Sequence, residues 1–390
     1  MRAAVVGGSL GGLHAALLLH ELGVEVDVYE RSPAELAERG AGIGFLPESA
    51  RYLVERAGVP LDRISVATSH IRYLDRRGER VYDGAHTYRF SSWNTVYRAL
   101  KACFPAPRYH LGHEMTGWAE RDDAVEIHLA GRPARWVDLL VCADGVGSTA
   151  RARLLPTVRP AYAGYVAWRG MVPEASLDAG TRAALADAIT YHVYANSHIL
   201  AYPIPGVDGS VAPGKRPMNF VWYRNYLEGG DLDDVLTDEA EQRRELSVPP
   251  GAVPARHVAE MRAVARARLP APLARVVESV ERPFLQVIYD IEVPRMAFGR
   301  VCLLGDAAFV VRPHAAAGTA KAAADAWALA DTLARDGDVP AALARWETGQ
   351  LALGARLLER TRRIGRRSQV DGTWVPGDPE LIFGLRGPGQ

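Results

Sequence analysis

The 390-residue chain has little of what marks a secreted, membrane-bound or nucleic-acid-binding protein. Its three cysteines, Cys103, Cys142 and Cys302, form no C-x-x-C pair, which predicts reduced, buried thiols in place of a disulfide framework or a metal site. The N-terminus shows no secretory leader, and no apolar run is long enough to span a bilayer. The formal net charge is zero, so no overall field attracts nucleic acid or an anionic membrane. We therefore expect a cytoplasmic protein without a membrane, nucleic-acid or metal partner.

The first thirty residues predict a strand, a helix and a second strand. Residues 2–7 have the pattern of a buried strand, apolar residues recur at helical spacing over 10–22, and residues 24–30 have the pattern of the next strand. This order is the βαβ unit of a parallel sheet. Two later apolar runs, 136–143 and 300–305, each lead into an Asp and a Gly, and we expect both to join the same sheet.

The turn after the first strand carries a glycine-rich fingerprint. Gly7, Ser9 and Gly12 occupy the three key positions of G-x-G-x-x-G, and Leu10 opens the helix. Small residues here let a pyrophosphate approach the free amides of a helix start. Glu30 ends the next strand, where an acidic side chain accepts from ribose hydroxyls. The pattern predicts a dinucleotide site, and the distant Asp-Gly sites favour FAD over NAD, because a ribityl chain needs contacts beyond the first βαβ unit.

The middle and the end of the chain differ in texture from its beginning. Segments such as TYHVYANS and MNFVWYRN alternate aromatic and polar residues, which indicates an antiparallel sheet, and after Gly305 the chain is mostly helical to about Ser368. We predict an α/β fold: a Rossmann-like FAD-binding domain with an inserted, mainly antiparallel β-sheet substrate domain and a helical C-terminal region. The predicted parts are 1–160 for the first piece of the FAD-binding domain, 161–293 for the substrate domain, and 294–390 for the completion of the FAD-binding domain with the C-terminal helices.

Several longer segments resemble one known family. They include VVGGSLGGLHAALLL, AGYVAWRG, LLGDAAFVVRPHAAAGTAKA and PGDPELIFGL. In these, and almost from end to end, the chain resembles the aromatic-ring flavoprotein monooxygenases of the 4-hydroxybenzoate hydroxylase class, and within it the dihydroxypyridine branch. Trp93 in place of a frequent Arg and Ala320 in place of the usual Asn are typical of that branch. Near Pro205 the sequence IPG replaces a carboxylate-binding Arg, which argues against a benzoate substrate.

The resemblance implies a set of residues that contact FAD. Residues 30–31 would bind the adenosine half, 144–145 would lie near the pyrophosphate, and the Asp of the GD pair 305–306 would hold the ribityl chain. Amides of 318–320 would face the pyrimidine end of the flavin, where the reduced ring carries negative charge. The predicted cofactor-binding residues are Gly7, Ser9, Leu10, Gly12, Glu30, Arg31, Asp144, Gly145, Gly305, Asp306, Gly318, Thr319 and Ala320.

The same resemblance implies a reaction: a homodimeric enzyme hydroxylates a small electron-rich aromatic, a hydroxypyridine or a phenol. NADH or NADPH and dioxygen would be co-substrates, by way of a flavin C4a-hydroperoxide. His314, between the GD pair and the flavin-facing helix, is the first candidate for hydrogen bonding or deprotonating the substrate. Tyr194 and Tyr202 complete the predicted catalytic set, while His192 and His198 receive no role.

Other functions stay open at this stage. The same scaffold can serve a flavin reductase or dehydrogenase that does not use oxygen, or a flavin-binding protein without catalysis. A halogenase is disfavoured, because no W-x-W-x-I-P-like segment occurs. His314 itself has a plainer alternative, in which it only packs or caps its loop.

Overall fold

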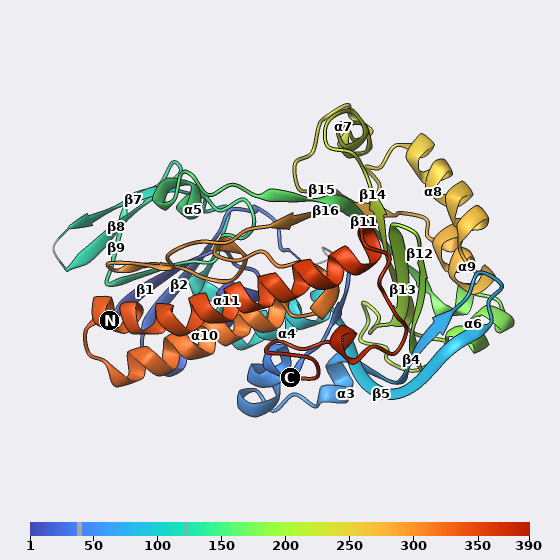
Figure 1. Ribbon diagram of the computed structural model, residues 1–390. Coiled ribbons are helices and arrows are strands. Elements are labelled where there is room, and N and C mark those ends of the chain that lie inside the picture. The colour runs from blue at the N-terminus through green and yellow to red at the C-terminus, as the bar shows by residue number, and fades with distance from the viewer. Residues whose placement is uncertain (37–40, 122) are drawn as a thin grey trace.

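The computed structural model describes residues 1–36, 41–121 and 123–390. This part of the chain forms a six-stranded sheet, a nine-stranded sheet and a small three-stranded sheet. Figure 1 shows the six-stranded sheet behind the long helices α10 and α11, with the nine-stranded sheet beside it. The observed architecture confirms the predicted α/β class with its helical C-terminal region.

The six-stranded sheet holds the predicted nucleotide-binding unit, and its strand order is β17-β18-β10-β1-β2-β6. The five parallel strands and the antiparallel edge strand β17 have these bounds: β1 (Arg2–Val6), β2 (Glu25–Glu30), β6 (Tyr109–Leu111), β10 (Leu139–Cys142), β18 (Val301–Leu303) and β17 (Ala297–Phe298). Helix α1 (Leu10–Glu21) connects β1 to β2, so the predicted strand, helix, strand order is confirmed. Both Asp-Gly strands join this sheet, because β10 pairs with β1 and β18 pairs with β10.

The apolar run 136–143 is split between two sheets. The Asp138 carboxylate accepts a hydrogen bond of 2.7 Å from the Arg2 amide and marks the break. Before it, β9 (Arg135–Val137) pairs with β8 (Ala124–Leu129), which pairs with β7 (Met115–Arg121) in the three-stranded sheet. After it, β10 enters the six-stranded sheet.

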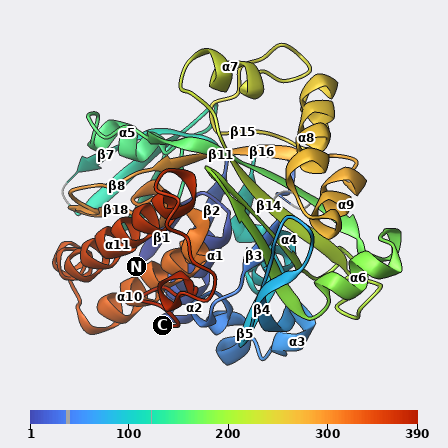
Figure 2. The same ribbon diagram turned by 45° about the vertical axis from the view of Figure 1, so that its right-hand side comes forward.

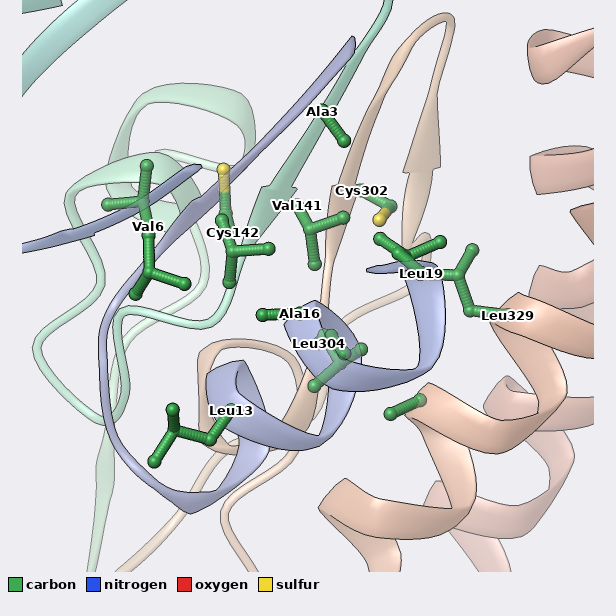
Figure 3. Close-up of a cluster of buried hydrophobic side chains, with 14 of the residues drawn as sticks. Ala3, Val6, Leu13, Ala16, Leu19, Val141, Cys142, Cys302, Leu304 and Leu329 are labelled. Atoms are coloured by element: carbon green, nitrogen blue, oxygen red, sulfur yellow. The ribbon is translucent and has the colours of Figure 1, made fainter. Parts of the chain in front are cut away.

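Helix α1 is packed on more than one side. It contacts the parallel sheet and also α10 (Gly318–Arg335), and Figure 3 shows Leu13, Ala16 and Leu19 between strand residues and Leu329. A helix that is enclosed in this way is apolar nearly all round, as the sequence of α1 is. The N-terminus of α1 is therefore held rigidly at the edge where β1 ends.

The nine-stranded sheet has the order β15-β16-β11-β14-β13-β12-β4-β5-β3. Its strands are β3 (Gly42–Gly44), β4 (Val66–Leu74), β5 (Arg80–Ser92), β11 (Ala161–Pro173), β12 (Ala188–Tyr194), β13 (Ser197–Pro203), β14 (Pro217–Asn225), β15 (Ser247–Val248) and β16 (Phe284–Asp290). Within the described chain only β12 and β4 pair in parallel, so the sheet is mainly antiparallel as predicted.

Three strands of this sheet come from the N-terminal region. Strands β3, β4 and β5 fall within residues 1–160, which the sequence analysis gave to the first piece of the FAD-binding domain, yet they pair with one another and with β12. Their side chains explain the pairing, since Tyr73 stacks on Tyr191 and Phe90 stacks on Tyr202 across the sheet. Such long-range pairing leaves no mark in the local pattern.

The two faces of the large sheet are covered differently. One face packs its apolar residues against α6 (Ala179–Leu185), α7 (Gly230–Leu236), α8 (Ala255–Arg268) and α9 (Ala271–Ser279). Figure 2 shows α8 and α9 outside the sheet, on the side away from α10 and α11. The other face carries a cluster rich in tyrosine, against which the C-terminal residues Trp374 and Phe383 pack.

The C-terminal region is helical as predicted. Helices α10 and α11 (Val339–Gln369) pack together, and the chain then returns to the large sheet, where Trp374 donates to the Tyr73 hydroxyl at 3.1 Å. The remaining α-helices are short: α2 (Pro47–Arg51), α3 (Leu61–Ile64), α4 (Trp93–Cys103) and α5 (Thr149–Leu154). Among the described helices, none combines the length and apolar character that crossing a bilayer requires.

The cysteines only partly follow the prediction. All three are free, and Cys142 and Cys302 are buried in β10 and β18. Cys103 is exposed, so the expectation of a buried thiol is wrong there. It is the last residue of the amphipathic helix α4, where the helix side meets solvent. The described residues contain no group of three or more metal-ligating side chains.

Candidate active site

The turn between β1 and α1 has room only for glycine at positions 7 and 12. Gly7 has φ +100°, and a Cβ there would lie 2.2 Å from the carbonyl oxygen of Ala143; a Cβ on Gly12 would lie 1.9 Å from the carbonyl oxygen of Gly7. Ser9 is the N-cap residue of α1, but its side chain makes no capping bond, and Leu10 starts the helix. The amides of the first turn are therefore left for an anion, and the small side chains let it come close.

Glu30 stands beside this turn at the end of β2. Its buried carboxylate accepts from the Gly8 amide at 2.9 Å and from the Ser32 amide at 2.8 Å. The carboxylate therefore holds the glycine turn and has further lone pairs for ribose hydroxyls. Arg31 is exposed next to it. The Tyr109 hydroxyl donates to the Gly8 carbonyl at 2.8 Å and fixes the turn from the other side.

Asp144 and Gly145 follow β10. The Asp144 carboxylate accepts from the Ser148 hydroxyl at 2.6 Å and from the Ala150 amide at 3.2 Å, so it shapes its own loop and the start of α5. Gly145 has φ +75°, and a Cβ on it would meet no atom within 4 Å. The loop thus turns its backbone toward open space near the carboxyl ends of the parallel strands, where nucleotides bind in such sheets.

The GD pair follows β18, the strand next to β10. Gly305 has φ +63° and donates its amide to the Asp325 carboxylate at 3.0 Å. The Asp306 side chain keeps an exposed surface in the protein without FAD. The protein atoms packed around its carboxylate nevertheless desolvate it and raise its pKa to about 6. Lys321 and Arg151 oppose this rise. Buried Arg151 also donates to the Ala307 carbonyl at 3.0 Å, which joins α5 to the GD pair.

The start of α10 completes this arrangement. Gly318 is its first residue, a Cβ on it would meet no atom within 4 Å, and the Thr319 hydroxyl lies 2.9 Å from that of Ser49. Ala320 is buried, and below it Lys321 pairs with Asp325 at 2.7 Å with both side chains buried. The helix start is open to a ligand, and the Lys321–Asp325 pair holds it against the GD pair. The glycine turn, the acidic groups and this open helix start fit FAD.

A second group of residues lies on the tyrosine-rich face of the large sheet, which we call the aromatic face. It comprises Tyr165 of β11, His198 and Tyr202 of β13, Tyr223 of β14, and His314 from the 3₁₀ turn Pro313–Ala315. The His314 ring lies 4.8 Å from the Tyr223 ring and 5.3 Å from the His198 ring, measured between centroids. Tyr202 stacks on Phe90 at 4.2 Å.

His314 is buried and held on one side only. Its Nε2 lies 2.7 Å from the Tyr165 hydroxyl, while its Nδ1 finds no hydrogen-bond partner among the described residues. Desolvation lowers the pKa of His314 well below 6.5, and His198 and Arg312 lower it further. Burial also lowers the pKa of His198, to about 3, and raises that of Tyr202 to about 12. These imidazoles are therefore neutral near pH 7.

Tyr194 does not belong to this group. Tyr194 lies three positions after Tyr191 in β12, so the two side chains lie on opposite faces of the sheet. Tyr191 belongs to the aromatic face, whereas Tyr194 packs against the apolar cluster on the other face, which includes Trp222. The expectation that Tyr194 shares a substrate site with His314 and Tyr202 is corrected by this placement. A strand pattern does not state which alternate set faces which side of a sheet.

Known proteins with the same organisation were found by sequence and by structure. Residues 162–290 match the family described as FAD binding domain-like, and 288–359 match the family described as FAD binding domain. A 2,6-dihydroxypyridine 3-monooxygenase from Paenarthrobacter nicotinovorans is 39% identical over 98% of this chain and 96% of its own length. The structure of 2,6-dihydroxypyridine-3-hydroxylase from Arthrobacter nicotinovorans superposes with a TM-score of 0.94 at 38% identity, over 99% of this chain and 97% of that one.

This chain belongs to the FAD-dependent aromatic monooxygenases. A more distant relative, 6-hydroxynicotinate 3-monooxygenase from Bordetella bronchiseptica, is 28% identical over 98% of this chain and 94% of its own length. The predicted family, fold and FAD dependence of the monooxygenase are confirmed by these matches.

Several residues of the candidate site are not predicted by the sequence. Arg151, Lys321 and Asp325 brace the GD pair, and the pairing of Lys321 with Asp325 at helical spacing inside an apolar helix was a usable signal. Tyr165 bonds to His314 across 149 positions of the chain, and no local pattern marks that contact. The sequence pattern assigns no role to His198, but its ring lies against that of His314.

Proposed function

We propose that this monooxygenase hydroxylates a small hydroxypyridine, with 2,6-dihydroxypyridine as the first candidate, using dioxygen and NADH or NADPH. The observation that carries the proposal is the end-to-end similarity to a relative named for that reaction, at 39% identity. Bound FAD supplies the electrons and the activated oxygen of such a reaction. The residues of the chain hold the aromatic ring, exclude water and stabilise charge on the ring oxygen.

The aromatic face supports a substrate without a carboxylate. Arg169 is the cation of β11 on this side of the sheet, but its guanidinium already donates to the Gly42 carbonyl at 2.6 Å and to Gln286 at 2.9 Å. The loop after β13 offers Pro205 and Gly206 where a carboxylate clamp would stand. The buried polar atoms of this face that have no partner among the described residues include the neutral His314 Nδ1 and Asn219 Nδ2 and one cationic atom, Arg169 Nε. A neutral or singly ionised ring with hydroxyl groups suits this set.

A coupled assay tests the proposal. FAD-loaded protein is mixed with NADH or NADPH and with 2,6-dihydroxypyridine, 6-hydroxynicotinate or salicylate, and NAD(P)H oxidation, oxygen uptake and product mass are followed together. We expect 2,6-dihydroxypyridine to accelerate NAD(P)H oxidation and to yield a hydroxylated product, and the two carboxylated rings to have much less effect. NAD(P)H oxidation that is equally fast without any ring, and that yields no hydroxylated product, would show a flavin reductase instead.

We further propose a homodimer that acts in the cytoplasm. The dimer rests on the resemblance to the flavoprotein monooxygenases, and the cytoplasmic location rests on a composition with 24% charged residues. Light scattering on the purified FAD-loaded protein measures the oligomeric state directly, and a monomer at micromolar concentration would contradict the proposal.

A further inference from the structure

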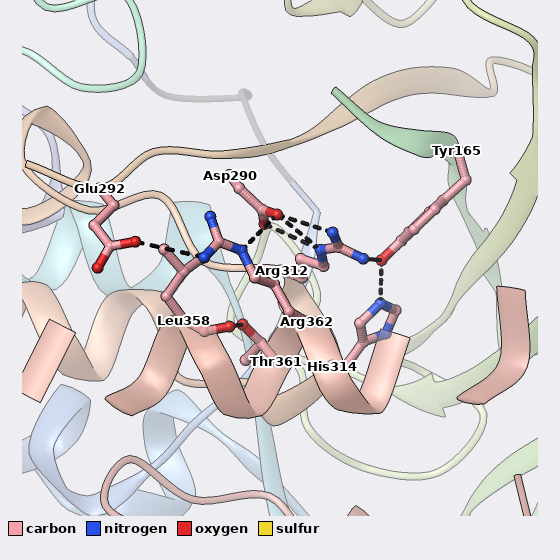
Figure 4. A network of polar contacts seen from close by, with 8 residues as sticks. All are labelled: Tyr165, Asp290, Glu292, Arg312, His314, Leu358, Thr361 and Arg362. Atoms are coloured by element: carbon pink, nitrogen blue, oxygen red, sulfur yellow. Dashed lines mark hydrogen bonds and ion pairs between the residues drawn. The ribbon is translucent and has the colours of Figure 1, made fainter. Parts of the chain in front are cut away.

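The hydrogen bond between Tyr165 and His314 determines where the imidazole carries its proton. The Tyr165 hydroxyl lies 2.7 Å from His314 Nε2, and both side chains are buried (Figure 4). A neutral imidazole has one N–H donor and one acceptor nitrogen, and the direction of this single bond decides which nitrogen is which. Burial raises the pKa of Tyr165 well above its ordinary value, so the hydroxyl keeps its proton.

Arg312 sets the direction of that bond. Its Nη1 lies 3.5 Å from the Tyr165 hydroxyl oxygen, while its Nε and Nη2 donate to the Asp290 carboxylate at 3.0 and 2.8 Å (Figure 4). A guanidinium only donates, and its positive charge repels a hydroxyl hydrogen that points toward it. The Tyr165 oxygen therefore faces Arg312 with its lone pair, and its hydrogen points to His314 Nε2.

Helix α11 closes the remaining side of the bond. A Cβ on Gly365 would lie 2.6 Å from the Tyr165 hydroxyl and 2.9 Å from His314 Nε2. This leaves no space for another acceptor beside the Tyr165 hydroxyl. The titratable and charged groups around the imidazole are Tyr165, His198, Tyr223 and Arg312, from three strands and the preceding turn, and none of them offers a carboxylate to it.

We infer that Tyr165, oriented by the Arg312–Asp290 pair, fixes His314 as the Nδ1–H tautomer, so that its free nitrogen donates a hydrogen bond to an anionic oxygen of the substrate. This inference rests on the proposed function for the identity of the ligand. His314 Nδ1 is one of several buried polar atoms without a partner among the described residues, and a donor aimed at a ligand accounts for it. In this arrangement His314 does not take a proton from the substrate. The hydroxypyridine releases its proton to solvent and binds as the anion, whose ring is the electron-rich form that hydroxylation needs.

The tautomer is measured without any turnover. Protein loaded with FAD and labelled with ¹⁵N-histidine is examined by long-range ¹H–¹⁵N NMR, and the His314 signals are assigned from the His314→Gln variant. We expect the nitrogen pattern of the Nδ1–H tautomer in the wild type at pH 7. A dominant Nε2–H tautomer or a doubly protonated ring in the wild type would overturn the inference.

Two matched variants test the role of Tyr165. Tyr165→Phe removes the hydroxyl that bonds to His314, whereas Tyr223→Phe removes a hydroxyl from a neighbouring ring that makes no hydrogen bond to His314 among the described contacts. We expect a mixture of both tautomers in Tyr165→Phe and an unchanged Nδ1–H tautomer in Tyr223→Phe. An unchanged tautomer in a folded Tyr165→Phe variant would overturn the assignment to Tyr165.

The ligand's ionisation tests the donor role. The absorption spectrum of bound 2,6-dihydroxypyridine is followed against pH with anaerobic, FAD-loaded protein. We expect the bound ligand to ionise at lower pH than the free ligand, and the anion to bind roughly twofold more weakly to Tyr165→Phe, because only about half of a mixed tautomer population presents the Nδ1–H donor. A bound ligand that stays neutral where the free ligand is ionised would overturn the donor role. Failure of every hydroxypyridine to bind would contradict the proposed function and the donor role, while the NMR result would still decide the tautomer.

Discussion

Asp290 holds two arginines at the junction of the large sheet and α11, and its replacement by asparagine should be costly. The carboxylate is 5% exposed and accepts from Arg312 at 2.8 Å and from Arg362 at 3.0 Å (Figure 4). Asparagine keeps the shape but leaves Arg312, whose side chain is only 11% exposed, without its counter-ion, and leaves Arg362 with Glu292 alone. Breaking a buried ion pair costs about 3–5 kcal/mol. Because Arg362 is 41% exposed and can recover water, we expect about 3 kcal/mol for Asp290→Asn, the low end of that range.

Glu292→Gln is the matched control for this prediction. Glu292 bonds to the same Arg362 at 3.4 Å, but its side chain is 47% exposed, and exposed pairs contribute less than about 1 kcal/mol. Urea titrations of both variants, with FAD removed, give the two losses in the free energy of unfolding. The reasoning is refuted if Asp290→Asn loses no more stability than Glu292→Gln. The NMR spectrum of Asp290→Asn should also show a mixture of His314 tautomers, since Arg312 is then free to move away from Tyr165.

Three further predictions concern the cofactor cradle and the thiols. In Gly12→Ala the new Cβ would meet the Gly7 carbonyl oxygen at 1.9 Å, so the variant should not bind FAD and should be purified without yellow colour. Gly349→Ala is the control: Gly349 lies on the exposed side of α11 with no atom within 4 Å of the new Cβ, so this variant should keep FAD and gain up to about 1 kcal/mol of stability. The pKa of Asp306 is raised to about 6 from an ordinary 3.8, so ionisation of this carboxyl lowers the stability of the folded protein as pH rises between these values. Without FAD, Asp306→Asn should therefore unfold at a higher temperature than the wild type at pH 7 but not at pH 3. The same variant should bind FAD more weakly. Thiol titration with an alkylating reagent should modify Cys103 alone in the folded protein and all three cysteines after denaturation, and fast labelling of a second thiol in the folded state would contradict the burial described.

The sequence allowed the nucleotide half of the molecule to be predicted closely. The βαβ unit and its turn from Gly7 to Gly12 could be predicted because strand, turn and helix follow one another within a few residues. The GD pair could be placed at the end of a strand because it directly follows an apolar run. The two Asp-Gly strands were placed in the same sheet because each ends in the same pair of residue types. Their register beside β1 agrees with that prediction.

The substrate half was predicted in kind but not in detail. The antiparallel character of the sheet is visible in the alternating pattern, but the recruitment of β3, β4 and β5 depends on contacts between distant parts of the chain. Tyr194 was misplaced because a one-residue change of phase moves a side chain to the opposite face of a strand. The Asp290, Arg312, Tyr165 and His314 network joins three distant segments, so only the fold brings its members together.

The measurement that tests the account most directly is the origin of the oxygen in the product. FAD-loaded protein, NADH and 2,6-dihydroxypyridine are incubated under ¹⁸O₂ in ordinary water, and the product is analysed by mass spectrometry. The account predicts a trihydroxypyridine that carries one ¹⁸O atom, formed in proportion to the NADH consumed. NADH consumption that yields only hydrogen peroxide, or a product without the label, would contradict it.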